Sequence, residues 1–242
     1  ITLQQLVYRQ TRTRPGIVRR RMLKMAQNAL GDSIEIDPHL TPSYNPWDQR
    51  LCLAPNGDFF EAIKSGKASI VTGDVDSFSK DGLRMSTGEC VDADIVITAT
   101  GLQLVVLGEV SVSVDGHPVD FGDTVTYKGF AYSGVPNLCT SFGYVNASWT
   151  LRSDLIAAYV CRLLNHLEQT GTRQCTPRLG PREHEMPLRP FIDGFNPGYL
   201  KRVEDRLPKQ GDRAPWLNTQ NYRNDLKQLR DGPVADGAME FK

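Results

Sequence analysis

No two of the 21 glycines in this chain of 242 residues are separated by a single residue. The sequence therefore contains no G-x-G-x-x-G loop, and it has no G-K-[ST] of a P-loop either. In nucleotide-binding proteins these glycines let the backbone approach a pyrophosphate at the N-terminus of a helix. The chain cannot build a dinucleotide-binding or P-loop domain of these types from its own residues.

The composition is that of a globular protein without a strong charge. Lysine and arginine number 28, as do aspartate and glutamate, and 40% of the residues are hydrophobic, enough for a packed core. The five cysteines form no C-x-x-C pair, which favours a reducing cytoplasmic setting. The longest apolar run is interrupted by polar residues and is too short for a membrane span. The four histidines lack the spacing of metal ligands, so we expect no metal site.

Residues 1–31 are expected to be helical and strongly basic, with Pro15 suited to a helix start and Gly31 to a helix end. A basic helix of this kind can bind nucleic acid or an anionic membrane surface. The remainder of the chain is not basic, so a solvated helical face is the favoured interpretation. Peripheral contact with a membrane stays open as an alternative, and nucleic acid is not expected as a partner.

In the middle of the chain, the sequence pattern predicts short helices and strands separated by turns. A helix is expected over residues 58–64, with Asp58 as its cap and Gly66 just past its end. The hydrophobic patterns and turn dipeptides predict strands over 69–72, 75–78, 83–86 and 94–98, a hairpin at Asp115-Gly116, and a buried strand over 137–142.

The most regular helix follows this strand and ends at Gly171. Its apolar residues recur at helical spacing on one face. The tail from Cys175 onward is polar and is expected to wrap a larger body, with helices near 198–206 and 219–230. The residues of the apolar face are Leu151, Leu155, Ile156, Tyr159, Val160, Leu163, Leu164 and Leu167.

Two segments have a composition suited to chemistry. In the loop 44–52, the guanidinium of Arg50 could bind an anion or stabilise a developing negative charge. Alternatively Arg50 pairs with Asp48 or Asp58, and Trp47 anchors the loop. The second segment, 137–150, leads from a strand through a turn into the long helix, whose N-terminus suits a carbonyl or anion. Here the alternative is ordinary packing with Trp149 in the core and with Asn146 or Ser148 as a cap.

Several stretches, in this order, resemble the flavin-containing monooxygenases of the Baeyer–Villiger type, and in particular their ethionamide-activating bacterial branch. The likeness extends through nearly the whole chain from about residue 35. The most specific stretches are YNPWDQRLC, beginning at Tyr44, and GYVNASWTL, beginning at Gly143. The matching ranges are 39–72, 93–104, 126–129, 143–155, 207–216 and 219–222.

The resemblance implies an α/β fold that is incomplete in this chain. Members of the family carry an FAD-binding and an NADPH-binding domain, both Rossmann-like and each with its own glycine loop. The chain is similar to their C-terminal portion only, with mixed strands and a long amphipathic helix. Residues 1–98 would be the C-terminal part of the NADPH-binding domain with its basic helical insert. Residues 99–242 would be the C-terminal part of the FAD-binding domain with a wrapping tail.

The resemblance also implies roles for individual residues. Arg50 matches the active-site arginine that stabilises the anionic peroxyflavin and positions the nicotinamide. Gln49 stands where many relatives place a lysine that contacts the NADPH 2′-phosphate, so this contact is expected to differ here. The remaining cofactor-binding residues implied by the resemblance are Thr100, Gly101, Gly143, Tyr144, Asn146, Ala147 and Trp149.

The implied function is that of an oxidoreductase with FAD and NADPH as cofactors. It would insert one oxygen atom from O2 into a ketone, or oxidise a thioether or thioamide sulfur, through a C4a-peroxyflavin. Because both glycine loops are absent, we expect the chain by itself to be inactive and to require the N-terminal half as a partner. The alternative is a non-catalytic truncated chain that serves only as a binding partner of another chain.

Overall fold

The computed structural model describes residues 2–52 and 54–242, and the chain divides into two compact units. The smaller unit spans Val7–Leu102, and the larger unit comprises Gln103–Lys242 with the first residues of the chain. The first residue of the expected basic segment lies outside the described residues. The expected nucleotide-binding identities of residues 1–98 and 99–242 stay predictions.

The basic segment is helical, as expected, and forms α1 (Thr2–Thr13) and α2 (Pro15–Leu30), with Pro15 in the first turn of α2 and Gly31 directly after it. The helix expected over residues 58–64 is α3 (Asp58–Lys64). The expectation that Asp58 caps this helix is wrong, because Gly57 takes the cap position in the left-handed conformation, with φ of 71°. Asp58 is instead the first helical residue, where its charge favours the N-terminal end of the helix dipole.

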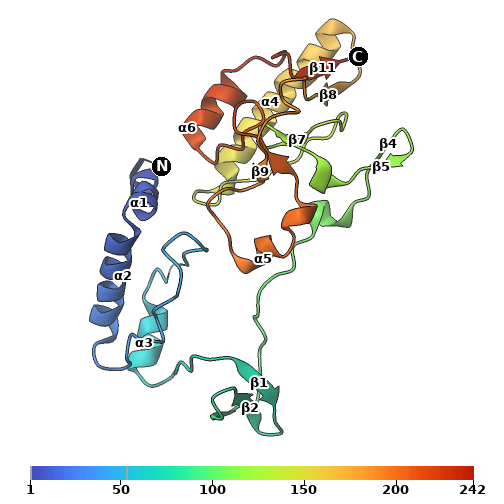
Figure 1. Cartoon of the computed structure of the whole chain (residues 1–242). Coiled ribbons are helices and arrows are strands. Elements are labelled where there is room, and N and C mark those ends of the chain that lie inside the picture. The colour runs from blue at the N-terminus through green and yellow to red at the C-terminus, as the bar shows by residue number, and fades with distance from the viewer. Residues whose placement is uncertain (1, 53) are drawn as a thin grey trace. The chain divides into compact units, whose positions relative to one another are not determined.

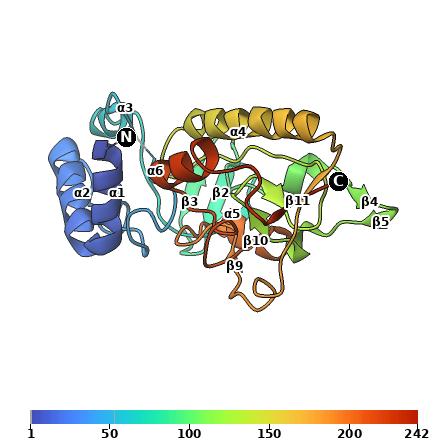
Figure 2. The ribbon, with the colours of Figure 1, turned by 90° about the horizontal axis from the view of Figure 1, so that it is seen from above.

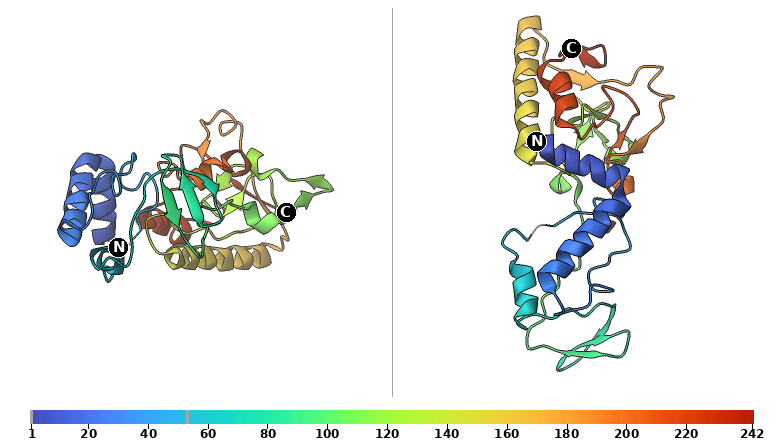
Figure 3. Two further views of the ribbon diagram at one scale, coloured as in Figure 1. Left: turned by 90° about the horizontal axis from the view of Figure 1, so that it is seen from below. Right: turned by 90° about the vertical axis from the view of Figure 1, so that its left-hand side faces the viewer.

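The strands of the smaller unit form one antiparallel sheet in the order β1-β2-β3 (Figure 3). The strands are β1 (Val75–Phe78), β2 (Gly82–Met85) and β3 (Cys90–Asp92), which confirms the expected strands at 75–78 and, within a residue, at 83–86. The strands expected over 69–72 and 94–98 are wrong, because neither segment pairs with a neighbouring strand. Ile95 and Ile97 are 80% and 86% exposed.

The larger unit is built along α4 (Trp149–Thr170), which lies on one side of it (Figures 1 and 2). The helix ends as expected at Gly171, which is left-handed with φ of 69°. Leu164, expected on the apolar face, is 59% exposed, because each residue turns the helix by about 100° and carries it to the edge of the buried stripe. The buried residues of α4 are Arg152, Leu155, Ile156, Tyr159 and Leu163.

The strands of the larger unit are short and pair in twos, all antiparallel. The hairpin expected at Asp115-Gly116 is confirmed. Among residues 2–52 and 54–242 the only parallel pairs are isolated bridges, so these residues contain no parallel sheet. The pairs are β4 (Ser113–Val114) with β5 (His117–Pro118), β6 (Thr126–Tyr127) with β7 (Ala131–Tyr132), β8 (Cys175–Pro177) with β11 (Met239–Phe241), and β9 (Arg189–Pro190) with β10 (Lys209–Gln210).

The buried strand expected over 137–142 is also wrong. Its backbone makes single hydrogen bonds instead of a ladder: the N–H of Asn137 donates to Cys175 and that of Thr140 donates to Phe130. Asn137 has a φ of 54°, which is incompatible with a regular strand at this point.

The polar tail contains the two expected helical regions, both shorter than expected. The first is α5 (Gly198–Lys201), followed by a 3₁₀ turn (Glu204–Arg206). The second is α6 (Tyr222–Asp225), which continues as a π-helical turn (Leu226–Arg230). α6 starts at Tyr222 because the side chain of Asn221 accepts from the N–H groups of Arg223 and Asn224. Two further 3₁₀ turns span Val106–Glu109 and Phe121–Asp123.

The main core of the larger unit joins α4 to both the preceding strands and the tail. Tyr127 and Tyr159 are buried beside Trp216, Leu229 and Met239 from the tail. Within the described residues, no helix combines the length and apolar character needed to cross a bilayer.

The packing of this core predicts an order of cysteine reactivity. Burial raises the pKa of the Cys139 thiol to about 11 and also raises the pKa of the buried Cys175. Cys52, Cys90 and Cys161 are exposed. Because the thiolate is the nucleophile, we expect iodoacetamide at mildly alkaline pH to label Cys139 and Cys175 at least about tenfold more slowly than the other three. Mass spectrometry of timed samples checks the order, and rapid labelling of Cys139 would contradict this core.

Candidate functional site

The turn that leads into α4 is tightly packed around a glycine. Gly143 and Tyr144 are buried, and the rings of Phe142 and Trp149 lie 5.0 Å apart on either side of the turn. A Cβ atom on Gly143 would stand 2.2 Å from Cγ of Trp149, so no larger residue fits at this position. Trp149 itself is 54% exposed, and the expected alternative of a core tryptophan is therefore wrong.

The N-terminus of α4 offers backbone donors without a side-chain cap. Ser148 occupies the cap position, but its hydroxyl contacts the hydroxyl of Thr150 at 2.8 Å and makes no capping hydrogen bond. The first turn contains no acidic residue. The first N–H groups of a helix lack intrahelical partners and carry partial positive charge, so this end suits a carbonyl oxygen or an anion.

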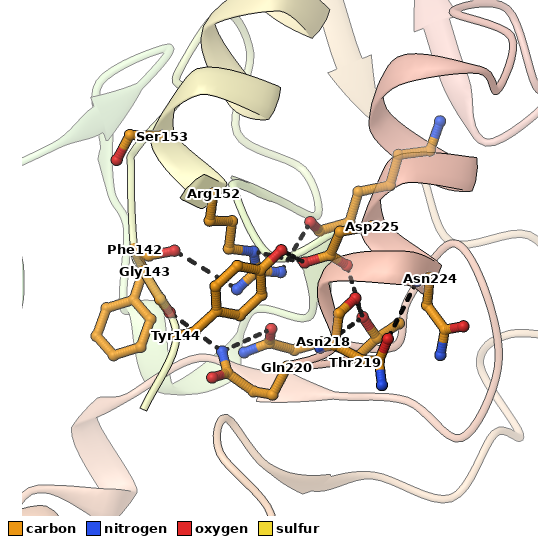
Figure 4. A network of polar contacts seen from close by, with 12 residues as sticks. Phe142, Gly143, Tyr144, Arg152, Ser153, Asn218, Thr219, Gln220, Asn224 and Asp225 are labelled. Atoms are coloured by element: carbon orange, nitrogen blue, oxygen red, sulfur yellow. Dashed lines mark hydrogen bonds and ion pairs between the residues drawn. The ribbon is translucent and has the colours of Figure 1, made fainter. Parts of the chain in front are cut away.

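A buried polar network lies between the turn and the C-terminal tail (Figure 4). The carboxylate of Asp225, 2% exposed, accepts from the hydroxyl of Tyr144 at 2.7 Å and from that of Thr219 at 2.5 Å. Nε of Arg152, from the first turn of α4, lies 3.1 Å from the same carboxylate as an ion pair without hydrogen-bond alignment. Arg152 is 0% exposed, so the network brings a full charge pair into the interior.

A second contact holds the backbone of the turn directly. Oε1 of Gln220 accepts from the N–H of Val145 at 2.9 Å, and its Nε2 donates to the carbonyl of Gly143 at 3.3 Å. The side-chain amide thus pairs with the turn as a neighbouring strand would. Burial, followed by the charge of Asp225, raises the pKa of Tyr144 well above its usual range, so the hydroxyl stays protonated as a donor.

Arg152, Asp225 and Gln220 were not among the expected site residues. Arg152 could have been found from the sequence, because it stands three and four residues before Leu155 and Ile156 on the apolar face of α4. A charged residue at such a position requires a buried partner. No local pattern, however, identifies that partner as Asp225 in the distant tail.

The loop that carries Arg50 belongs to the smaller unit and is anchored by its tryptophan. The ring of Trp47 packs edge-on against Tyr8 of α1 at 5.7 Å, and the guanidinium of Arg50 lies 5.7 Å from the centre of the Trp47 ring. Asp48 pairs with Arg12 at 2.7 Å. Partial burial opposes ionisation of Asp48, but the hydrogen bond and the charge of Arg12, together with hydrogen bonds from Asn45, outweigh it and lower the pKa of the carboxyl. Arg50 itself is exposed.

The other expected contact residues lie apart along the chain. Gln49 is half-buried and forms an isolated bridge with Pro46, while Thr100 and Gly101 are exposed in the smaller unit. In the larger unit, Asn146 and Ala147 are half-buried within the turn. The described residues contain no group of three histidine, cysteine or acidic side chains placed to hold a metal ion. The assignment of these residues to a cofactor stays a prediction.

The close contact at Gly143 can be tested by adding one methyl group. We expect Gly143→Ala to lower the free energy of unfolding of the chain by about 1–3 kcal/mol, because both the ring and the backbone of Trp149 must move. Gly198→Ala is the matched control in the same unit, where the nearest atom is the mobile end of Arg202 at 3.4 Å. Urea unfolding followed by tryptophan fluorescence measures both. Equal stabilities of the two variants would contradict the packing of this turn.

Comparison with known proteins places the chain beside flavoenzymes. It is 44% identical over 234 residues to "FAD-containing monooxygenase EthA" of Mycolicibacterium smegmatis, covering 97% of this chain and 47% of the relative. It is 39% identical over 241 residues to "Probable FAD-binding monooxygenase AlmA" of Acinetobacter baylyi, covering 100% of this chain and 48% of the relative.

"Putative FAD-containing monooxygenase MymA" of Mycobacterium tuberculosis is 40% identical over 241 residues, again with 100% of this chain and 48% of the relative covered. No family model and no solved structure matches. The chain thus spans about half the length of the curated relatives it matches. Over nearly its whole length, the chain is a homologue of the C-terminal part of the FAD-containing monooxygenases.

Proposed function

We propose that this chain forms the flavin-facing part of an FAD- and NADPH-dependent monooxygenase. The reaction would insert one oxygen atom from O2 into a ketone, in the Baeyer–Villiger manner, or oxidise a thioether or thioamide sulfur of a small molecule. The observation that carries this proposal is the similarity of at least 39% identity to FAD-containing monooxygenases along nearly the whole chain. The buried turn at Gly143 supports it with a donor set that suits a flavin edge.

In this proposal the chain's residues bind and orient, and the cofactor supplies the oxygen chemistry once NADPH has reduced it. The first turn of α4 would hold the carbonyl edge of the ring and would favour negative charge there. Asn146, Ala147 and Trp149 line the same wall. Arg50 stabilises the negative charge that develops next to the substrate. Gln49, Thr100 and Gly101 line the path of the nicotinamide cofactor.

The proposal includes the fold and the setting of the complete enzyme. The two units would be C-terminal parts of two Rossmann-like domains, and the missing pyrophosphate loops would come from an N-terminal half. Alone, the chain would be inactive because its sequence has no glycine loop to hold a pyrophosphate. We place the enzyme in the cytoplasm, with peripheral contact to a membrane through the basic helices as the alternative.

A second function, a non-catalytic chain that binds another chain, is favoured by one observation. The segment 93–102 is apolar and extended, and Ile95, Ile97 and Leu102 are 80%, 86% and 62% exposed. Exposed apolar residues gathered in this way mark an interaction surface. Such a strand, buried on both faces in a parallel sheet, would be typical of a dinucleotide-binding fold.

A chimera tests the first proposal. The N-terminal part of the M. smegmatis relative that this chain does not match is fused to residues 1–242, and the chain alone is the control. We expect the chimera to purify yellow with bound FAD and to oxidise NADPH, and the chain alone to do neither. A folded chimera without flavin would contradict the proposal, and a yellow, NADPH-oxidising chain alone would contradict its inactivity.

The same chimera tests the role of Arg50. Arg50→Lys is expected to lower kcat about a hundredfold while leaving the FAD content unchanged, because a lysine cannot present the planar guanidinium. Arg20→Lys, at an exposed position of α2, is the matched control and should have no effect.

Assembly tests the second function without requiring catalysis. We expect the separately expressed N-terminal part of the relative to co-elute with this chain in size-exclusion chromatography. The double variant Ile95→Lys, Ile97→Lys should abolish co-elution, because charged side chains would have to be buried in the contact. Met25→Lys, at a position 70% exposed on α2, is the control. Co-elution that survives the double variant would contradict this surface.

A further inference from the structure

The tail of the larger unit returns to the turn at Gly143 and holds it from below. Residues 218–225 supply Thr219, Gln220 and Asp225, and each contacts either the turn or the buried charge beneath it. Figure 4 shows Asp225 next to Tyr144 and Arg152. In the same view Thr219 reaches Asp225, and Gln220 reaches Gly143. None of them belongs to the residues assigned to the cofactor above.

The contacts around Arg152 hold its side chain in one position. Its guanidinium lies 5.5 Å from the centre of the Tyr144 ring and donates to the carbonyls of Phe142 at 3.5 Å and Lys128 at 3.4 Å. Gly129 has a φ of 71°, and a Cβ atom there would stand 2.2 Å from Nη2 of Arg152. The backbone therefore leaves room for the guanidinium only because residue 129 is a glycine.

The charge of Arg152 fixes where the tail must lie. A buried guanidinium without a counter-charge is strongly unfavourable, and Asp225 is the carboxylate that meets it. Asn221 caps α6 and so orients the short helix that presents Asp225. The tail then holds the turn at two places. Asp225 binds the hydroxyl of Tyr144, and Gln220 binds the backbone of Gly143 and Val145 on either side of that residue.

We propose that Arg152, Asp225 and Gln220 are positioning residues that clamp the turn Gly143–Val145 against the start of α4. The clamp sets the spacing between the turn and the free N–H groups of the helix. This role rests on the proposed function, in which both line one wall of the flavin site. In this role the C-terminal tail supports the cofactor site by holding the turn.

The test uses variants that loosen the clamp by different means. Gln220→Ala removes the pairing with the turn, Tyr144→Phe removes only the hydroxyl that reaches Asp225, and Asp225→Asn removes the counter-charge. Glu240→Gln is the matched control. Glu240 lies on β11 of the same unit, and the substitution removes its exposed ion pair with Arg178. Asp225→Asn leaves Arg152 buried and unpaired, so the other two variants keep the test valid if this one fails to fold.

Amide hydrogen exchange of the full chain gives the first readout. We expect Gln220→Ala and Tyr144→Phe to accelerate exchange in residues 143–149 about tenfold, because the first variant removes both hydrogen bonds to the turn and the second removes the hydrogen bond to Asp225. The amide of Val145, which donates to Gln220, should be most affected in Gln220→Ala. Exchange in β8 and β11 should stay unchanged, as it should throughout in the control. Acceleration that is absent from 143–149, or equal throughout the unit, would overturn the clamp.

Flavin binding by the chimera gives the second readout. We expect both variants to weaken FAD binding about tenfold and to change the visible circular dichroism of the bound flavin, whereas the control changes neither. Local acceleration of exchange with unchanged flavin affinity and spectrum would overturn the positioning role and leave a purely structural one. An unsubstituted chimera that binds no FAD contradicts the proposed function and the cofactor role with it, while hydrogen exchange still decides whether the clamp holds the turn.

Discussion

The buried charge of Arg152 is the constraint on which the larger unit depends. A guanidinium that is 0% exposed at the start of the longest helix requires a carboxylate in the interior, and Asp225 provides it from the tail. Removal of one partner from such a pair typically costs about 3–5 kcal/mol, whereas an apolar replacement of both is often neutral. The pair is therefore weak as a source of stability but strong as a means of fixing which segment lies beneath the turn.

A second buried pair connects the same parts of the chain. Nζ of Lys128 lies 2.9 Å from the carboxylate of Asp236 and stands over the rings of Tyr127 and Tyr159 at 5.0 and 4.6 Å. Burial lowers the pKa of Lys128, although Asp236 acts in the opposite direction. The tail is thus joined to the preceding strands and to α4 at two charged points as well as through its apolar side chains. The polar composition of this tail reflects buried contacts as well as solvent exposure.

Local patterns predicted the elements that need no distant partner. The end of α4 at Gly171 follows from periodicity and a C-terminal glycine, and the hairpin at Asp115-Gly116 follows from its turn residues. The bounds of α3 were also predicted, although its cap is Gly57 and not Asp58. The clamp could be predicted only in part, because Arg152 stands out on an apolar face whereas Asp225 and Gln220 belong to an unremarkable polar tail. Which of the tail's acidic residues meets Arg152 depends on the path of the chain, and a single sequence does not contain that path in any local pattern.

Segments 94–98 and 137–142 belong to no sheet, and they show that an apolar pattern alone does not produce a strand. A strand is completed by the hydrogen bonds of its neighbours, and the run of Ile95, Val96 and Ile97 has the apolar character of a strand enclosed on both faces. The described residues provide antiparallel pairs of two or three short strands and no parallel sheet to receive it. The curated relatives are about twice as long as this chain. In the proposed function, strand partners for this segment would come from the part of those proteins that the chain does not match. In the proposed function, the residues that predicted a strand incorrectly for this chain would be the ones that join it to an N-terminal half.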